Sequence, residues 1–201
     1  FLAGRGRSGS HVRVHVIVAG WEPGRTRAAQ RLIEELIERE RLTVGTRTLV
    51  VEGAWSEESR YRCLSAGNEG LDLGRLGVGV KSVLAEAKRG DCLLLVNDRL
   101  ADYEKKHALL RFVTSDLIDY VGRHSAIAGK VWSVGQVYDF DGKRSRTWVQ
   151  SHCMLIGADF ARRIRLETIL TEYGRASLRF DSSGRLASSG VVDPAFVRYL
   201  E

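Results

Sequence analysis

Three pairs of residues in this chain each follow a short apolar run, and two of the pairs carry side chains that suit contact with a polar ligand. The pairs are Gly20-Trp21, Glu52-Gly53 and Asn97-Asp98. A carboxylate or amide at the end of an apolar strand can bind a ribose or sugar hydroxyl, or a metal ion that is held on a diphosphate. Asp98 could instead cap a helix that follows it, so the residue type alone leaves both interpretations open.

A glycine-rich segment lies between the second and third pairs. Five of the fourteen residues at 66–79 are glycine, and Asn68 and Asp72 lie among them. Glycine lets the backbone approach a ligand closely, and consecutive N–H groups can bind an anion. We therefore expect a loop here rather than a helix or strand, either binding a ligand or purely structural. Neither the dinucleotide fingerprint nor the P-loop pattern occurs in it.

Asp139 and Asp141 form an Asp-x-Asp pattern in the second half of the chain. Two carboxylates at this spacing can hold a divalent metal ion. Asp141-Gly142 is also a common turn sequence, in which aspartate has a structural use. The turn is the favoured interpretation, and the metal site is the alternative.

The segment 148–152 reads Trp-Val-Gln-Ser-His and has a β-like composition. In a strand, Trp148, Gln150 and His152 would share one face. An aromatic ring beside an amide and an imidazole suits a sugar, whose hydroxyls those polar groups can bind. A buried and merely hydrogen-bonded Gln150 and His152 is the alternative.

The first half of the chain carries the pattern of a parallel sheet. Apolar runs and helical periodicities alternate as strand, helix, strand, helix, strand over about 85 residues, which predicts an α/β fold with helices covering the sheet. Ligands of such sheets bind beyond the carboxyl ends of the strands, where the three pairs named above lie. The predicted strands are 12–20, 46–51 and 92–96, and the predicted helices are 25–41 and 81–88.

The second half changes to a different pattern. Two β-like runs flank Asp141-Gly142, which predicts a β-hairpin. Helical spacing of apolar residues comes before and after it, and a stretch rich in Ser, Gly and Arg follows as a predicted loop. The β-like runs are 130–140 and 147–157, the predicted helices are 109–121 and 159–173, and the loop is 174–190.

The composition is that of an ordinary globular protein. Hydrophobic residues make up 44% of the 201 residues and charged residues 28%, which excludes a disordered chain. Three cysteines without a Cys-x-x-Cys pair exclude a disulfide framework and argue against a zinc site, so we expect a reducing, cytoplasmic setting. The net charge is +6, which permits contact with phosphates or an anionic membrane surface; a solvated basic surface is the simpler interpretation.

Four segments together resemble a known family. They are NEGLDLG at 68–74, LLLVNDRL at 93–100, VWSVGQVYDF at 131–140 and TWVQSHCMLIGADFARRI at 147–164. Their order and spacing are similar to those of the GT-A-like glycosyltransferases that build rhamnan-type, capsular and O-antigen polysaccharides. The resemblance extends over about residues 12–165. It implies a GT-A-like, Rossmann-related fold in which 11–105 bind a nucleotide-sugar donor and 106–201 hold a glycan or lipid-linked acceptor.

The resemblance also implies roles for single residues. Asp98 would be the catalytic residue and the ligand of a Mg²⁺ or Mn²⁺ ion, although the sequence there is Asn-Asp-Arg rather than Asp-x-Asp. Arg75 or Arg99 could neutralise the diphosphate instead. The other implied contacts are Gly20, Glu52, Asn68, Asp72 and Asn97 for the donor, and Trp148, Gln150 and Ser151 for the sugar or acceptor. No convincing acidic base follows the last predicted helix, where Glu167 and Glu172 are only candidates.

The expected function is therefore sugar transfer from a nucleotide-sugar, with inversion, in the synthesis of a cell-surface polysaccharide. We expect one α/β domain at 11–201 behind a flexible lead-in at 1–10, no organic cofactor, and peripheral contact with the inner face of the membrane. The alternative is a non-catalytic module, or one that binds nucleic acid or phosphate through an arginine-rich surface. Nucleic acid is the less expected partner, because no RNA-binding motif or helix-turn-helix pattern is present.

Overall fold

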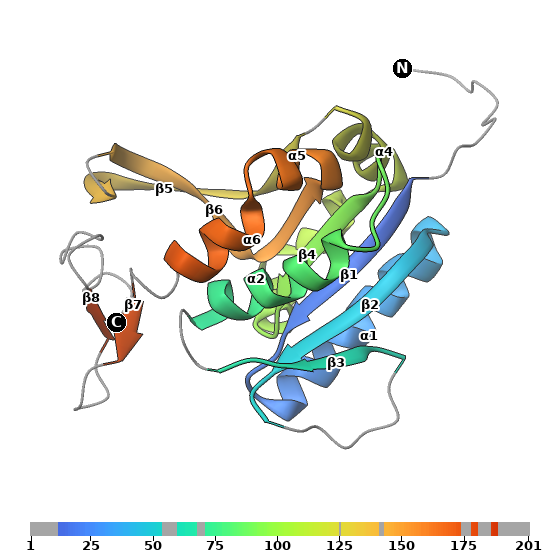
Figure 1. Ribbon diagram of the computed structural model, residues 1–201, viewed down its shortest axis with the longest axis horizontal. Helices are drawn as coiled ribbons and strands as arrows, with labels where there is room; N and C mark the ends of the chain where they lie inside the picture. The colour runs from blue at the N-terminus through green and yellow to red at the C-terminus, as the bar shows by residue number, and fades with distance from the viewer. Residues whose placement is uncertain are drawn as a thin grey trace.

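The computed structural model describes residues 12–53, 60–67, 71–124, 126–140, 143–173, 178–180 and 186–188. These residues form an α/β fold around a mostly parallel sheet of six strands (Figure 1). The strands are β1 (Arg13–Ala19), β2 (Thr43–Val51), β3 (Arg62–Ser65), β4 (Cys92–Asn97), β5 (Ile127–Phe140) and β6 (Lys143–Gly157). The helices are α1 (Pro23–Glu40), α2 (Leu71–Leu84), α3 (Leu100–His107), α4 (Ser115–Arg123), α5 (Ala158–Arg163) and α6 (Leu166–Thr168), with a 3₁₀ turn η1 (Leu109–Phe112) and a π turn η2 (Ile169–Tyr173).

The strand order is β3-β2-β1-β4-β6-β5. The first four strands are parallel, whereas β6 runs antiparallel to β4 and forms a hairpin with β5. The chain moves outward in one direction from β1 to β2 and β3, then returns to place β4 on the other side of β1. The carboxyl ends of β1 and β4 therefore meet at a topological switch point, the usual ligand position of such sheets, and Ala19 lies opposite Asn97 there.

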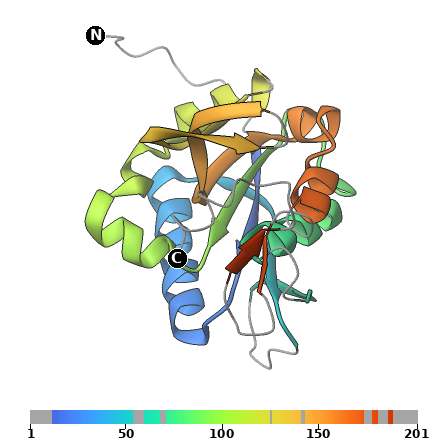
Figure 2. The same ribbon diagram turned by 90° about the vertical axis from the view of Figure 1, so that its left-hand side faces the viewer.

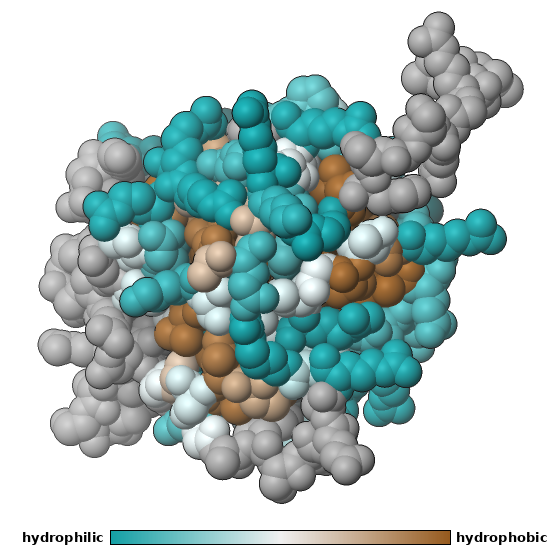
Figure 3. Space-filling model, turned by 45° about the vertical axis from the view of Figure 1, so that its right-hand side comes forward, coloured by the Kyte–Doolittle hydropathy of each residue, from teal (hydrophilic) through white to brown (hydrophobic). Residues whose placement is uncertain are grey.

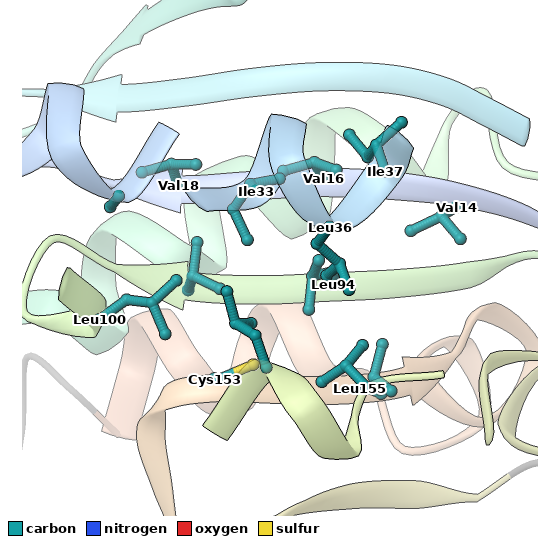
Figure 4. Packing of buried hydrophobic residues seen from close by; sticks show 14 of the residues in the cluster. Val14, Val16, Val18, Ile33, Leu36, Ile37, Leu94, Leu100, Cys153 and Leu155 are labelled. Atoms are coloured by element: carbon teal, nitrogen blue, oxygen red, sulfur yellow. The ribbon is translucent and has the colours of Figure 1, made fainter. Parts of the chain in front are cut away.

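Helices cover both faces of the sheet and bury a core on each. Figure 2 shows α1 and α3 on one side, and α2 with α6 on the other. The first core packs α1 against alternate residues of β1, as Ile33, Leu36 and Val16 do in Figure 4. The second packs α2, α5 and α6 against the opposite residues of β1, β2 and β4. The sheet is thus buried on both faces, which explains why its central strands read as continuous apolar runs.

Helix α2 corrects the prediction of a loop at 66–79. The helix begins at Leu71 and ends at Leu84, so the helix predicted at 81–88 was also misplaced. Two of its glycines allow close packing: a Cβ on Gly79 would collide with the side chain of Ile17 on β1 and press on Val50 of β2, and a Cβ on Gly77 would collide with Thr171 on η2. Composition does not distinguish this use of glycine from a loop.

The helices of the second half are shorter than predicted. The segment 109–121 is a 3₁₀ turn followed by α4, whose first turn is capped by the Thr114 hydroxyl accepting from Leu117 N. The segment 159–173 is likewise divided, because Arg165 has a positive φ of 53° between α5 and α6. Helix α3 was not among the predicted helices, and only the alternative interpretation of Asp98 as a helix cap allowed for it.

The hairpin of β5 and β6 is confirmed, with Phe140 opposite Lys143 at its end. Its turn residues, Asp141 and Gly142, lie outside the described residues, as does the lead-in at 1–10. In the predicted loop at 174–190, the structure instead describes a small antiparallel pair, β7 (Leu178–Phe180) and β8 (Leu186–Ser188).

The face of the molecule in Figure 3 is mixed in polarity, with apolar residues in separate patches between hydrophilic ones. Among the described helices, none has both the length and the apolar character that a bilayer crossing demands.

Candidate functional site at the sheet switch point

Asp98 shapes the loop between β1 and α1. Its Oδ2 accepts hydrogen bonds from the backbone N–H groups of Trp21 and Glu22, both at 2.9 Å, and the residue is only 3% exposed. Helix α3 begins after Arg99 without a side-chain cap, so Asp98 does not cap the helix that follows it. The loop it fixes leads into α1, whose first N–H groups are capped by the Glu22 carboxylate.

Asn97 joins three elements at the same point. Its Nδ2 donates to Asp72 Oδ2 on α2 at 2.6 Å and lies 3.4 Å from Ser151 Oγ on β6. Its Oδ1 accepts from Arg99 N and lies 3.2 Å from His152 Nδ1. Asn97 is fully buried, so each of these bonds offsets the cost of removing the amide from water.

Asp72 is a partly buried residue whose carboxylate has a shifted pKa. Trp21 donates its indole N–H to Oδ1 at 2.5 Å, and Asn97 donates to Oδ2. Burial raises the pKa of Asp72 above its ordinary value; the two hydrogen bonds oppose this effect, and the charge of Asp98 adds to it. Two nearby aspartates with a raised pKa in one of them are typical of a functional site rather than of a stabilising pair.

Arg75 is enclosed beneath Trp21. Its guanidinium donates to the Gly20 carbonyl and lies 3.2 Å from the Glu52 carboxylate, and its Cζ is 3.7 Å from the centre of the Trp21 ring. Since Arg75 is 1% exposed, it holds the strand ends together and offers no surface to an anion. Arg99 is exposed at the same edge, so of the two arginines considered for the diphosphate, Arg99 is the accessible one.

His152 extends the cluster toward α3. Its ring stacks on Tyr103 with 3.8 Å between ring centres. Burial, aided by the positive charges of Arg99 and Lys130, lowers the pKa of His152 to about 4. The imidazole is therefore neutral at pH 7, and because Asn97 Oδ1 is an acceptor, its proton lies on Nδ1.

The structure brings together six of the nine predicted site residues. Gly20, Glu52, Asp72, Asn97, Asp98 and Ser151 are connected through the contacts above. Gln150 lies beside them on β6, and among the described residues its buried Oε1 has no hydrogen-bond partner. Asn68 lies outside the described residues, and for Trp148 only the backbone, paired with Trp132, is described.

Sequence reasoning missed the contribution of Tyr103 and the side-chain role of Trp21. Tyr103 lies on α3, which is only eight residues long and carries three basic residues in its last turn. That composition hides the helical periodicity. Trp21 was named only as a strand-end residue, and nothing in its neighbours indicates that its indole bridges Asp72 and Arg75.

Within the described part of the chain, no three His, Cys, Asp or Glu side chains gather as metal ligands would. Asp98, the predicted ligand, uses Oδ2 for two backbone N–H groups. These side chains do not match a Mg²⁺ or Mn²⁺ site, and metal dependence stays a prediction.

Comparisons of this chain with protein-family models, with curated proteins and with solved structures find no match.

Proposed function

We propose that this chain is a glycosyltransferase that binds a nucleotide-sugar over the carboxyl ends of β1, β2 and β4. The observation that carries the proposal is the buried Asn97 amide, which ties the switch point of the sheet to Asp72 on one side and to Ser151 and His152 on the other. Ligands of open α/β sheets bind at this position. The resemblance of residues 12–165 to GT-A-like glycosyltransferases agrees with it.

One charged group of the site, Arg99, suits a leaving nucleoside diphosphate. The acceptor hydroxyl attacks the anomeric carbon, a new C–O bond forms, and the bond to the diphosphate breaks with its electron pair leaving on the phosphate oxygen. Positive charge placed at that oxygen lowers the barrier. Arg99 is exposed beside His152 and Asp72, whose pKa values both respond to its charge, so it is the group we assign to the diphosphate.

The acceptor side is supplied by β6 and by a carboxylate. Ser151 and His152, which are only partly buried, offer polar atoms to sugar hydroxyls. The hydroxyl proton must pass to a base during the attack. Asp98 is the carboxylate that we assign to this step, and the transfer proceeds with inversion.

A thermal-shift panel tests the proposal directly. UDP, GDP and dTDP, with CMP as the control, are added with and without Mn²⁺. Binding to the native state raises the midpoint as the ligand concentration passes Kd. We expect one nucleoside diphosphate to raise it, and the Mn²⁺ arm decides whether a metal contributes. A folded protein that no nucleoside diphosphate stabilises would contradict the proposal.

Two arginine variants locate the binding site. Arg99→Gln removes the exposed charge at the switch point and should weaken diphosphate binding about tenfold, as the loss of one charge-assisted contact does. Arg89→Gln is the matched control, because Arg89 is 96% exposed and precedes β4 at the opposite edge of the sheet. Equal affinities of the two variants would place the ligand elsewhere.

Asp98→Asn separates the two roles of Asp98. The amide keeps an oxygen that can accept from Trp21 and Glu22, so the loop is retained, while the base is lost. Donor binding should persist and sugar transfer should fall at least a hundredfold. Unchanged transfer by this variant would remove Asp98 from the mechanism.

A further inference from the structure

A pocket of about 420 Å³ lies beside the candidate site, between η1, α4 and the base of the β5–β6 hairpin. Its walls are mostly apolar and come from elements on the same face of the sheet. Phe112 and Leu117 form one wall, and Ala128 and Leu155 form the other. A cavity of this size and lining is in the range of small-molecule sites.

The mouth of the pocket is partly apolar as well. Phe112 lines it and is nevertheless 64% exposed, so an apolar side chain at the mouth is open to contact with another apolar group.

Basic groups accompany the pocket. Lys130 and His107 are among its lining residues, and Lys105 and Lys106 precede His107 in the last turn of α3. One carboxylate is also near: Glu104 acts electrostatically on Cys153, which lines the pocket. Glu104 accepts a hydrogen bond from Leu110 N at 2.8 Å and keeps its charge. Lys130 lines the pocket and Lys105 and Lys106 follow Glu104 in α3, so the basic side chains named here outnumber this carboxylate and favour an anion.

The pocket is linked to the switch point through aromatic rings. Lys130 Nζ lies 5.6 Å and the His107 ring 5.7 Å from the centre of the Tyr103 ring, and Tyr103 stacks on His152. A ligand with its apolar part in the pocket would therefore carry its polar part toward Asn97 and Ser151.

From these contacts we propose that the pocket binds the hydrocarbon chain of a lipid phosphate, with the phosphate at Lys130. An apolar cavity accounts for the chain, and the basic side chains account for the phosphate. The pocket itself is independent of the activity proposed above. Only the identification of this lipid with the glycosyl acceptor rests on the proposed function. With that function, the acceptor would be a lipid-linked glycan rather than a free glycan.

Calorimetric titration with alkyl phosphates below their micellar concentrations tests this site without a nucleotide. Octyl, decyl and dodecyl phosphate should bind with increasing affinity, by up to about fourfold per buried methylene, until the pocket is filled. Decyl phosphate should bind more tightly than decyl maltoside or decyltrimethylammonium. Inorganic phosphate alone should bind more weakly than any of the alkyl phosphates.

Two variants and a control connect binding to the pocket. Ala128→Phe fills the cavity from β5, where an aromatic residue suits a strand, and should reduce decyl phosphate affinity at least tenfold. Lys130→Met should reduce the preference for phosphate over maltoside and leave maltoside binding unchanged. Ser133→Phe is the matched control, since Ser133 is exposed on the same strand and does not line the pocket.

Three results would overturn the proposal. One is the absence of alkyl phosphate binding by the folded protein, and another is binding that Ala128→Phe leaves unchanged. The third is a concentration-dependent dimer that Ala128→Phe abolishes, because the pocket would then be covered by a second copy of the chain. Since none of these measurements uses a nucleotide, their failure is distinct from failure of the proposed transferase.

Discussion

Two aspartates near opposite ends of β4, Asp91 before it and Asp72 on α2 beside its carboxyl end, differ in their electrostatic state. At the amino end, Asp91 accepts hydrogen bonds from Lys88 N at 2.6 Å, from Arg13 at 2.7 and 3.3 Å, and from His15 at 3.0 Å. Burial alone would raise the pKa of Asp91, but these bonds outweigh it and hold the pKa below its ordinary value. At the carboxyl end, burial dominates and raises the pKa of Asp72.

This difference separates a group that stabilises the fold from one that is held at a cost. The charge of Asp91 is favourable in the native state, so its surroundings serve stability. The charge of Asp72 is unfavourable there, and a second carboxylate, Asp98, lies near enough to add to that cost. Such a cost is characteristic of a site kept for binding or catalysis, and it is one reason to look for function at the carboxyl edge.

The largest effect that we expect is on stability, from Asp91→Ala. The variant leaves Arg13 and the buried His15 without their carboxylate, and breaking such a pair costs about 3 kcal/mol. Chemical denaturation measures the loss. Asp159→Ala is the control, because Asp159 is about one-third exposed and its ion pairs are long, at 3.4 and 3.9 Å; it should cost less than about 1 kcal/mol. An equal loss of unfolding free energy in the two variants would mean that the bonds of Asp91 stabilise the fold no more than those of Asp159.

Asp72→Asn should show the reverse pattern. The amide loses an acceptor for Asn97 at a cost of about 1 kcal/mol, but it also removes an unfavourable buried charge, so the net change in stability should stay within about 1 kcal/mol. Affinity for the stabilising nucleoside diphosphate should fall about tenfold, which thermal shift and calorimetry measure. A variant destabilised as much as Asp91→Ala would mean that Asp72 is structural.

The pH dependence of stability gives the smallest effect and has opposite signs at the two ends. The lowered pKa of Asp91 supplies stability above its ordinary pKa, and this is lost as the pH falls through the native value. The raised pKa of Asp72 has the opposite effect. The contribution of Asp72 to the stability of the fold declines as the pH rises from the ordinary pKa of aspartate through the raised pKa of the native state. We therefore expect two changes in the free energy of unfolding, measured by denaturation from pH 3 to 7. In Asp91→Asn it should fall less at acid pH than in the unsubstituted protein, and in Asp72→Asn it should rise relative to the unsubstituted protein as the pH approaches 7. Parallel curves would contradict this.

The sequence predicted the sheet and the edge of the site better than the helices. β1, β4 and the last four residues of β2 are buried on both faces, so their apolar runs are unambiguous. The rule for the carboxyl ends of parallel strands then placed Gly20, Glu52 and Asn97 at one edge without any motif.

The remainder depended on tertiary contacts that no local pattern records. Helix α2 contains Gly77 and Gly79, whose missing side chains make room for Thr171 and Ile17. A loop has the same composition, so its helical state could not be read from the sequence. The enclosure of Arg75 by Trp21 and the stacking of Tyr103 on His152 also required the fold.

The partners of Asn97 also have a consequence for the order in which the chain is made. Asp72 lies 25 residues before it, whereas Ser151 and His152 come 54 and 55 residues after it. At the usual rate of synthesis, those two residues follow roughly 3 to 11 seconds later. The strands from β1 to β4 can therefore pair before β6 has been synthesised. Until β6 pairs with β4, that edge of β4 has no partner strand, and water must make the hydrogen bonds to the Asn97 amide that Ser151 and His152 make later.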